Sequence, residues 1–339
     1  MSNTFCVMPF YGAEYQKGGY ISPCCLMTNH NINEVRTAML DGKKPSSCSA
    51  CWKLEEKGIK SDRQYKNESY DFYADIDIRQ VFTNCKNGQF SPQIIKLYTS
   101  NLCNSACVTC GPKFSTHWQS VKGIPIQLNS MGDSVLDGID FADIKMLSML
   151  GGEPLYDKNI FNILQRLLDN NNTDCFISFV TNGNVKLTKQ QIDLLSKFKN
   201  LDICVSIDGI GPVYEYMRYP LKWADLEANI KQFKQFAKYV NVSYTLSNVN
   251  VLYYDETVAW FKENDLPFNH NVVTTPRYFN INALPKEAKE QCSSLTPLFR
   301  LHNEQDDVLF RTAIDEIAKQ DKLKNTSAAL SVPKFINLS

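Results

Sequence analysis

The stretch IIKLYTSNLCNSACVTC, residues 94–110, leads from a run of β-forming residues directly into three cysteines. The run Ile94–Ser100 has the length and the apolar, β-branched character of a buried strand. Cys103, Cys107 and Cys110 follow in the loop that leaves this strand. Three thiolates at this spacing can wrap one face of a cubane iron–sulfur cluster and leave one iron without a protein ligand.

The spacing alone does not decide which metal this loop would hold. His117 follows soon after the third cysteine, and with the three thiolates it would complete a Cys3His tetrahedron for zinc. An iron–sulfur cluster and a zinc ion are therefore both open alternatives for the loop.

Six β runs alternate with amphipathic helices from residue 94 onward. The runs are Ile94–Ser100, Ile144–Leu150, Cys175–Thr181, Leu201–Ile207, Asn241–Leu246 and Pro267–Thr274. Strict strand–helix alternation predicts right-handed βαβ units around a parallel sheet. Six units are too few for a full (β/α)8 barrel, so the sequence predicts an α/β fold, either an open doubly wound sheet or a partial barrel of six strands. In both architectures ligands bind at the carboxyl ends of the strands.

The chain divides into three parts by composition and pattern. Residues 1–90 lack the strand–helix alternation and are rich in cysteine and glycine, which predicts a separate small unit. Residues 91–275 form the predicted strand–helix core. Residues 276–339 are predicted as helices over Lys286–Gln291 and Asp306–Gln320 with a polar tail.

Composition excludes several classes of protein. The 339 residues include 36 Lys plus Arg and 36 Asp plus Glu, and this balance gives no electrostatic reason to expect nucleic acid or an anionic membrane as a partner. No apolar run is long enough to cross a membrane, and Met1–Gly19 lacks the order of a signal peptide, so a cytoplasmic location is expected. Nine of the 12 cysteines precede residue 111. In a reducing compartment such clustering indicates metal ligands or redox groups before disulfides.

Glycines and polar residues mark the ends of the later β runs. The second run ends in Gly151-Gly152-Glu153-Pro154, where glycines let backbone approach a ligand and a carboxylate can accept hydrogen bonds from an ammonium group. The third run ends in Thr181-Asn182-Gly183. In the fourth, period-two alternation puts Ser206 and Asp208 on one face near the carboxyl end. Each motif alone also fits an ordinary turn or cap.

Taken in order, the motifs CxxxCxxC, GGEP, TNG and SIDG on successive β runs resemble the radical S-adenosylmethionine (SAM) superfamily over roughly residues 94–275. The resemblance implies a partial (β/α)6 barrel of the TIM type, with a [4Fe–4S] cluster on the three cysteines whose open iron binds SAM. The SAM contacts that it implies are Gly151, Gly152 and Glu153 for the amino group, Ser206 and Arg218 for the ribose and carboxylate, and residues near Val273 for the adenine. The chain departs from the family at Thr109, where an aromatic residue is usual.

A second group of cysteines lies in residues 1–90. Cys6, Cys24, Cys48 and Cys51 supply four thiolates, enough for a closed zinc site or a second cluster, and Cys25 could take the place of Cys24. The arrangement of Cys6, Gly19 and Cys24 with the later C-x2-C pair resembles the SPASM and twitch modules, which carry auxiliary [4Fe–4S] clusters. Those modules normally follow the barrel, so a permuted auxiliary-cluster module and a convergent zinc knuckle are both open.

The resemblance implies an oxidoreductase-type enzyme that cleaves SAM reductively to a 5′-deoxyadenosyl radical, which removes hydrogen from a substrate. An external electron donor such as flavodoxin or ferredoxin is expected. Twitch and SPASM enzymes often modify peptides, so a peptide is the first substrate expected and a small metabolite or nucleotide-like molecule the second. A non-catalytic zinc-binding interaction protein is the alternative of a different class. Lys96, Asp202, Asp208 and Tyr216 could each face the substrate, and the sequence does not rank them.

Overall fold

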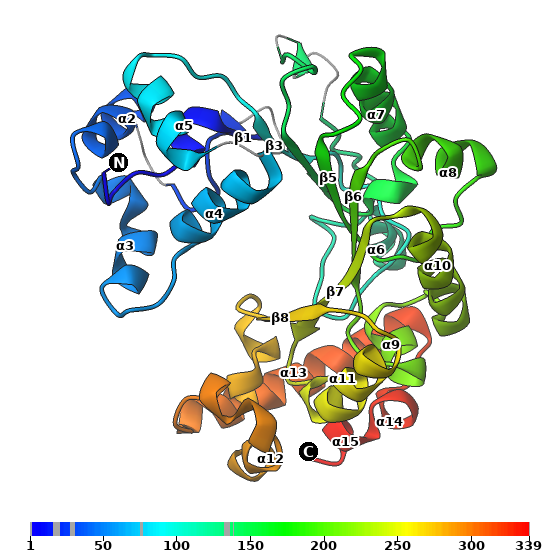
Figure 1. Cartoon of the computed structure of the whole chain (residues 1–339). Helices are drawn as coiled ribbons and strands as arrows, with labels where there is room; N and C mark the ends of the chain where they lie inside the picture. Colours follow the sequence, from blue (N-terminus) through cyan, green and yellow to red (C-terminus); the bar gives the residue numbers. More distant parts are fainter. Residues whose placement is uncertain are drawn as a thin grey trace.

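The computed structural model describes residues 2–15, 21–27, 31–74, 77–131, 136–137 and 139–338 and contains an eight-stranded sheet (Figure 1). The strands lie in the order β2-β1-β3-β4-β5-β6-β7-β8, and each neighbouring pair is parallel except β1 with β2. No pairing joins the two edge strands within the described residues, so the sheet is a partial barrel. The strands are β1 Gly12–Tyr15, β2 Ile21–Ser22, β3 Ile94–Tyr98, β4 Met146–Leu150, β5 Phe176–Thr181, β6 Asn200–Ser206, β7 Tyr239–Leu246 and β8 Phe268–Val272.

Helices connect the parallel strands, and further helices precede β3 and follow β8. They are α1 Met8–Tyr11, α2 Ile32–Leu40, α3 Ser49–Glu55, α4 Asp62–Ala74, α5 Ile78–Lys86, α6 Thr116–Val121, α7 Asn159–Asp169, α8 Lys189–Leu195, α9 Gly211–Met217, α10 Trp223–Phe236, α11 Tyr254–Glu263, α12 Lys286–Gln291, α13 Glu304–Lys324, α14 Ala328–Ser331 and α15 Pro333–Ile336. The predicted strand–helix alternation from residue 94 is confirmed, with a strand on each of the six β runs.

The two faces of the sheet differ in polarity because side chains alternate along each strand. On the outer face Leu97 and Ile203 are fully buried and belong to one apolar core with α7, α8, α10 and α11, which lie along one side of the sheet in Figure 1. On the inner face the strand register aligns Lys96, Ser178 and Asp202, all half-buried. At this level of the sheet the inner face is therefore polar and half-buried.

The amino-terminal segment contributes two strands that the sequence analysis did not predict. β1 pairs in parallel with β3, and its Glu14 lies opposite Lys96, so the sheet has eight strands in the described residues where six were expected. The surrounding helices have an apolar core of their own, which includes the fully buried Phe5, Met39 and Tyr70. The division into residues 1–90, 91–275 and 276–339 stays a prediction.

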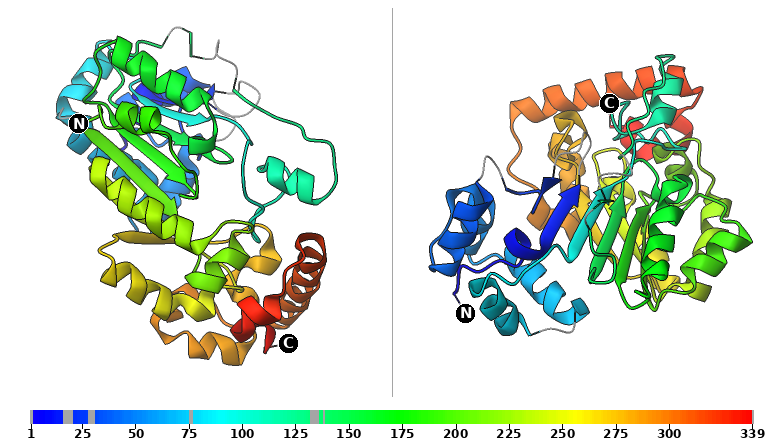
Figure 2. Two further views of the ribbon diagram at one scale, coloured as in Figure 1. Left: turned by 90° about the vertical axis from the view of Figure 1, so that its right-hand side faces the viewer. Right: turned by 90° about the horizontal axis from the view of Figure 1, so that it is seen from above.

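The carboxyl-terminal helices follow the sequence pattern. α12 has the predicted bounds, and α13 is longer than predicted, from Glu304 to Lys324. α13 begins at a capping box on Asn303 and ends at Asn325, whose φ of 53° lies in the left-handed region. It is the long orange-to-red helix of Figure 2. Within the described part of the chain, no helix combines the length and the apolar character that crossing a membrane requires.

Candidate metal and cofactor site

The three cysteines of the loop after β3 open onto one cavity at the carboxyl ends of the parallel strands. The cavity volume is about 220 Å³. Residues from five neighbouring strands or their loops line it, among them Cys103, Cys107, Cys110, Gly151, Gly152, Thr181, Asn182, Ser206, Asp208, Arg218 and Thr245. The structure thus brings together, on one side of the sheet, motifs that are separated by more than 100 residues of sequence.

Hydrogen bonds hold the cysteine loop in place. The Ser105 hydroxyl lies 3.3 Å from the Cys103 sulfur and 3.4 Å from the Cys107 sulfur. The main-chain N–H of Ala106 donates to the Tyr219 carbonyl at 2.6 Å. The Trp118 indole N–H donates to the Cys107 carbonyl at 2.9 Å. The loop backbone is therefore held by hydrogen bonds to Tyr219, after α9, and to Trp118 of α6.

Burial raises the pKa of the Cys103 thiol to about 11 and of the Cys110 thiol to about 12, and the nearby Cys107 adds to both. Uncompensated thiolates are therefore unfavourable here, and a cationic inorganic group would have to displace the protons. No three Cys, His, Asp or Glu side chains of the described residues converge closely enough to hold a single metal ion. The described structure does not assemble the Cys3His zinc site with His117, and the three thiols line one cavity together.

Gly152 is required by the close packing of the β4 end against the cysteine loop. A Cβ atom on this residue would lie 2.4 Å from the Leu102 carbonyl oxygen and 2.8 Å from the Asn101 carbonyl carbon. The main-chain N–H of Glu153 donates to the same Leu102 carbonyl at 2.8 Å. This contact explains the glycine without a ligand, and the predicted approach of SAM to this backbone stays a prediction.

The Glu153 carboxylate is 1% exposed and accepts three hydrogen bonds from the protein. One oxygen accepts from the Leu155 N–H at 3.0 Å and the Thr181 hydroxyl at 2.5 Å, and the other accepts from the Asn182 N–H at 2.6 Å. Burial raises its pKa to about 7, against the effect of these donors. A carboxylate offers about four acceptor positions, so one position is left for a further donor. Glu153 is not among the side chains that line the cavity.

Asp208 and Arg218 form a buried ion pair beside the cysteines. The Arg218 Nη2 atom lies 2.8 Å from the Asp208 carboxylate, whose other oxygen accepts from the Thr245 N–H at 3.1 Å. Burial opposes the charge of Arg218, but Asp208 and then Cys107 raise its pKa above the usual value. The Arg218 Nε–H has no hydrogen-bond partner in the described structure. A donor left unsatisfied in a cavity wall is suited to a ligand carboxylate or hydroxyl.

The structure places Ser206 and Val273, the two remaining predicted SAM contacts, differently with respect to the cavity. Ser206 lines the cavity, as does Thr109. Val273 is not among the lining residues, and its carbonyl accepts a hydrogen bond from the Asn280 side chain at 2.5 Å. Phe114, which the sequence analysis did not single out, lines the same cavity and supplies an aromatic side chain near Thr109. No motif in the sequence indicated Phe114, because its place in the cavity wall depends on the path of the loop that follows Cys110.

The amino-terminal cysteines line a second cavity. The cavity volume is about 20 Å³. Its walls include all four buried thiols of Cys6, Cys24, Cys48 and Cys51, whereas Cys25 is exposed and does not line it. Gly19 lies outside the described residues. Burial raises the pKa of Cys6 to about 12 and of Cys48 to about 11.

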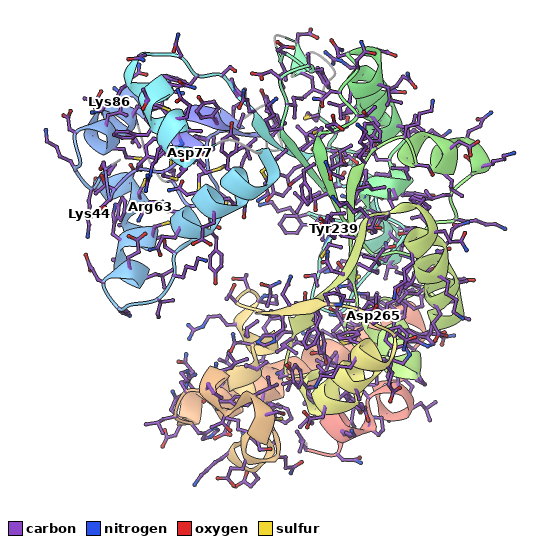
Figure 3. The ribbon with its side chains drawn as sticks, in the orientation of Figure 1. Lys44, Arg63, Asp77, Lys86, Tyr239 and Asp265 are labelled. Carbon is purple, nitrogen blue, oxygen red and sulfur yellow. The ribbon has the colours of Figure 1, made fainter. Side chains whose placement is uncertain are left out.

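Arg63 also lines this cavity and lies among the amino-terminal helices in Figure 3. It forms a bidentate ion pair with Glu55 and donates to the Phe5 carbonyl at 2.6 Å. It therefore ties α3 and α4 to the segment that carries Cys6. This framework holds the four thiols around one small cavity.

One family model matches more than half of the chain. It is described as the radical SAM superfamily and matches residues 97–290. No curated protein matches the chain.

Among solved structures, native anSMEcpe with bound AdoMet is 16% identical at a TM-score of 0.43, with 62% of this chain and 63% of that chain covered. Streptococcus suis SuiB bound to precursor peptide SuiA is 16% identical at a TM-score of 0.43, with 89% and 73% covered. The methyltransferase TsrM from Kitasatospora setae is 15% identical at a TM-score of 0.39, with 52% and 36% covered. The chain thus matches less than two thirds of the length of the first of these structures.

Proposed function

This chain belongs to the radical SAM superfamily, and on that premise we propose that it cleaves SAM reductively and uses the resulting radical to take hydrogen from a substrate. The family implies SAM and a [4Fe–4S] cluster. When bound, the cluster supplies the electron that breaks the carbon–sulfur bond of SAM. The residues of this chain hold the reactants, exclude water and supply the surrounding charge.

The observation that carries the proposal is the common cavity of the cysteine loop and the strand ends. Cys103, Cys107 and Cys110 would hold the cluster at one wall, and the Arg218 Nε–H, which is without a protein partner in the described structure, would donate to the carboxylate or ribose of SAM. Ser206 lines the same cavity and would donate a further hydrogen bond to these groups. Asp208 keeps Arg218 charged and oriented through the 2.8 Å ion pair.

We propose that the substrate lies against the polar inner face of the sheet. Lys96 and Asp202 are on this face, whereas Asp208 is paired with Arg218 and Tyr216 is buried in the apolar core. Glu14 of β1 lies beside Lys96 at 3.6 Å, and its second carboxylate oxygen has no partner in the described structure. Glu14 is buried, so of these groups the half-buried Lys96 and Asp202 would offer a donor and an acceptor to the amide groups of a peptide. Peptide modification follows further from the resemblance of the amino-terminal cysteines to twitch and SPASM modules.

The amino-terminal cavity is proposed to hold an auxiliary [4Fe–4S] cluster. Zinc would need four sulfurs at about 2.3 Å from one ion. The four thiols line one small cavity, and the resemblance to twitch and SPASM modules favours a cluster there over zinc. A cluster at this position would take an electron from the product radical or bind the substrate.

The test is anaerobic reconstitution of the full chain with iron and sulfide. The unmodified chain is expected to turn brown and to convert SAM to 5′-deoxyadenosine under dithionite. Cys107→Ala should abolish this conversion, while the control Cys175→Ala, at a buried cysteine outside both cavities, should retain it. A colourless, zinc-loaded chain, or undiminished conversion by Cys107→Ala, would refute the proposal.

A further inference from the structure

A segment with exposed apolar side chains follows α6. Ile124, Ile126 and Leu128 alternate along this segment and are 45%, 64% and 56% exposed. We call residues 124–128 the arm, and they belong to the teal segment that stands apart from the sheet in the left view of Figure 2. Single exposed apolar residues are ordinary on a protein surface, whereas several large ones together mark a binding surface.

The main chain of the arm is hydrogen-bonded on one side. The Gln127 carbonyl accepts from the Asn101 side-chain amide at 3.0 Å, and the Asn129 N–H donates to the Asn101 side-chain oxygen at 2.9 Å. In the part of the chain that the structure describes, the N–H and C=O groups of Ile126 and Leu128 have no hydrogen-bond partner. Bonds at alternate residues leave free groups at the residues between them, as at the edge of a β-sheet. Such an edge matches the main chain of a peptide and not a small metabolite.

A pocket of about 330 Å³ adjoins both the arm and the cavity of the cysteine loop. It shares three lining residues with that cavity, Phe114, Gly151 and Gly152. Asn101, which bonds to the arm, and Asn129, which directly follows the arm, also line the pocket. A group bound in this pocket would therefore lie next to the cavity proposed for the cluster and SAM.

The pocket combines large apolar side chains with one positive charge. Tyr98, Phe114 and Met131 supply the apolar surface, and Lys113 is the one charged residue among the described residues that line the pocket. The Lys113 Nζ lies 5.4 Å from the centre of the Phe114 ring, and this exposed side chain forms no ion pair within the described residues. The pocket is therefore suited to a large apolar side chain that has a carboxylate beside it.

We propose that the arm and this pocket bind the peptide substrate: the peptide lies extended along the arm, pairs its main chain with Ile126 and Leu128, and puts one large apolar side chain into the pocket beside Lys113. This proposal rests on the proposed function, because it states where the substrate named there is held. Main-chain pairing contributes affinity for many sequences, and the pocket contributes selectivity. Tyr98 lies two residues after Lys96 on the same face of β3, so a peptide held in this way reaches the inner face of the sheet.

The test measures binding of a fluorescein-labelled hexapeptide of alternating valine and threonine that contains one phenylalanine and one aspartate. Fluorescence anisotropy is recorded with the full-length reconstituted chain and SAM, and again with the cluster-free chain. Ile126→Ser combined with Leu128→Ser should weaken binding by about tenfold or more, because each buried CH2 group contributes about fourfold. Val308→Ser combined with Leu330→Ser, at exposed apolar positions of α13 and α14, is the matched control and should bind like the unmodified chain. Equal affinity of the arm variant, or no binding up to about 1 mM, would overturn the proposal.

N-methylated forms of the probe separate main-chain pairing from apolar contact alone. Methyl groups on alternate residues block the N–H groups along one edge of an extended peptide. Of two forms, methylated at odd or at even positions, one should bind about tenfold more weakly and the other should bind like the original probe. Equal effects of the two forms would contradict the pairing with the arm.

The charge of the pocket is tested with a probe whose aspartate is replaced by lysine. The unmodified chain should bind this probe about twofold to fivefold more weakly, and Lys113→Glu should reverse the preference. A preference that Lys113→Glu leaves unchanged would count against the pocket. A chain that binds the probe as expected but does not cleave SAM would contradict the proposed function and support the binding site, whereas a chain that cleaves SAM while its arm variant binds the probe unchanged would contradict the binding site alone.

Discussion

The free energy of unfolding should depend on pH because the Glu153 carboxyl is neutral below about pH 7 in the folded chain. Burial raises its pKa from 4.5 to about 7. The folded state therefore binds the proton more tightly than the unfolded state, so the contribution of this group to stability is greatest at low pH and is lost as pH rises through about 7. From about pH 5 to about pH 8 the loss is about 2.5 kcal/mol.

The measurement is urea unfolding of the reduced apo chain at several pH values between these limits. Glu153→Gln removes the titration, so the free energy of unfolding of the unmodified chain minus that of the variant should fall by about 2.5 kcal/mol across the range. Glu263→Gln, at an exposed position at the end of α11, is the matched control. A difference that does not change with pH would show that the carboxylate is ionised throughout, and that its bonds from Leu155, Thr181 and Asn182 outweigh its burial.

Three further predictions concern the two cavities. Cys48→Ala should lower the iron content of the reconstituted chain from about eight to about four per chain; an unchanged count would exclude an amino-terminal cluster. Gly152→Ala should displace the cysteine loop and reduce the iron bound there, while Gly111→Ala, whose added Cβ meets nothing within 4 Å, should bind iron normally; equal iron contents would refute the packing argument. Arg218→Met should lower the free energy of unfolding in urea by about 3–5 kcal/mol, because Asp208 would be buried without its partner; a loss under about 1 kcal/mol would contradict this.

The core of the fold could be predicted from the sequence because its signals are local and repeat. Runs such as Cys175–Thr181 have the length and apolar content of buried strands, and the helices between them bury one stripe each. β1 escaped prediction because Gly12–Tyr15 is short and lies outside the repeat, and only its register with β3 reveals it. Strand pairing across 80 residues leaves no mark in the local pattern.

In the site, too, local motifs could be predicted from the sequence and contacts between distant segments could not. The cysteine spacing and the glycines are motifs, and they predicted which loops would meet. The bonds of Glu153 to Thr181 and Asn182 depend on how the ends of β4 and β5 meet, and the sequence analysis assigned that carboxylate to a ligand alone. The contact of Lys324 with Trp118 joins segments far apart in the chain. Such contacts are set by tertiary packing, so single-sequence patterns do not contain them.

The pairing of β1 with β3 has a practical consequence for dissecting the protein. In the full chain β3 has a partner on both sides, β1 and β4. A fragment that starts near residue 91 would make β3 an exposed edge strand. The main-chain groups on one side of Ile94–Tyr98 would be unpaired, next to the apolar Ile95 and Leu97. Strands bared in this way recruit other chains and aggregate. A fragment of residues 91–339 would therefore need an added strand that restores the hydrogen bonds to β3.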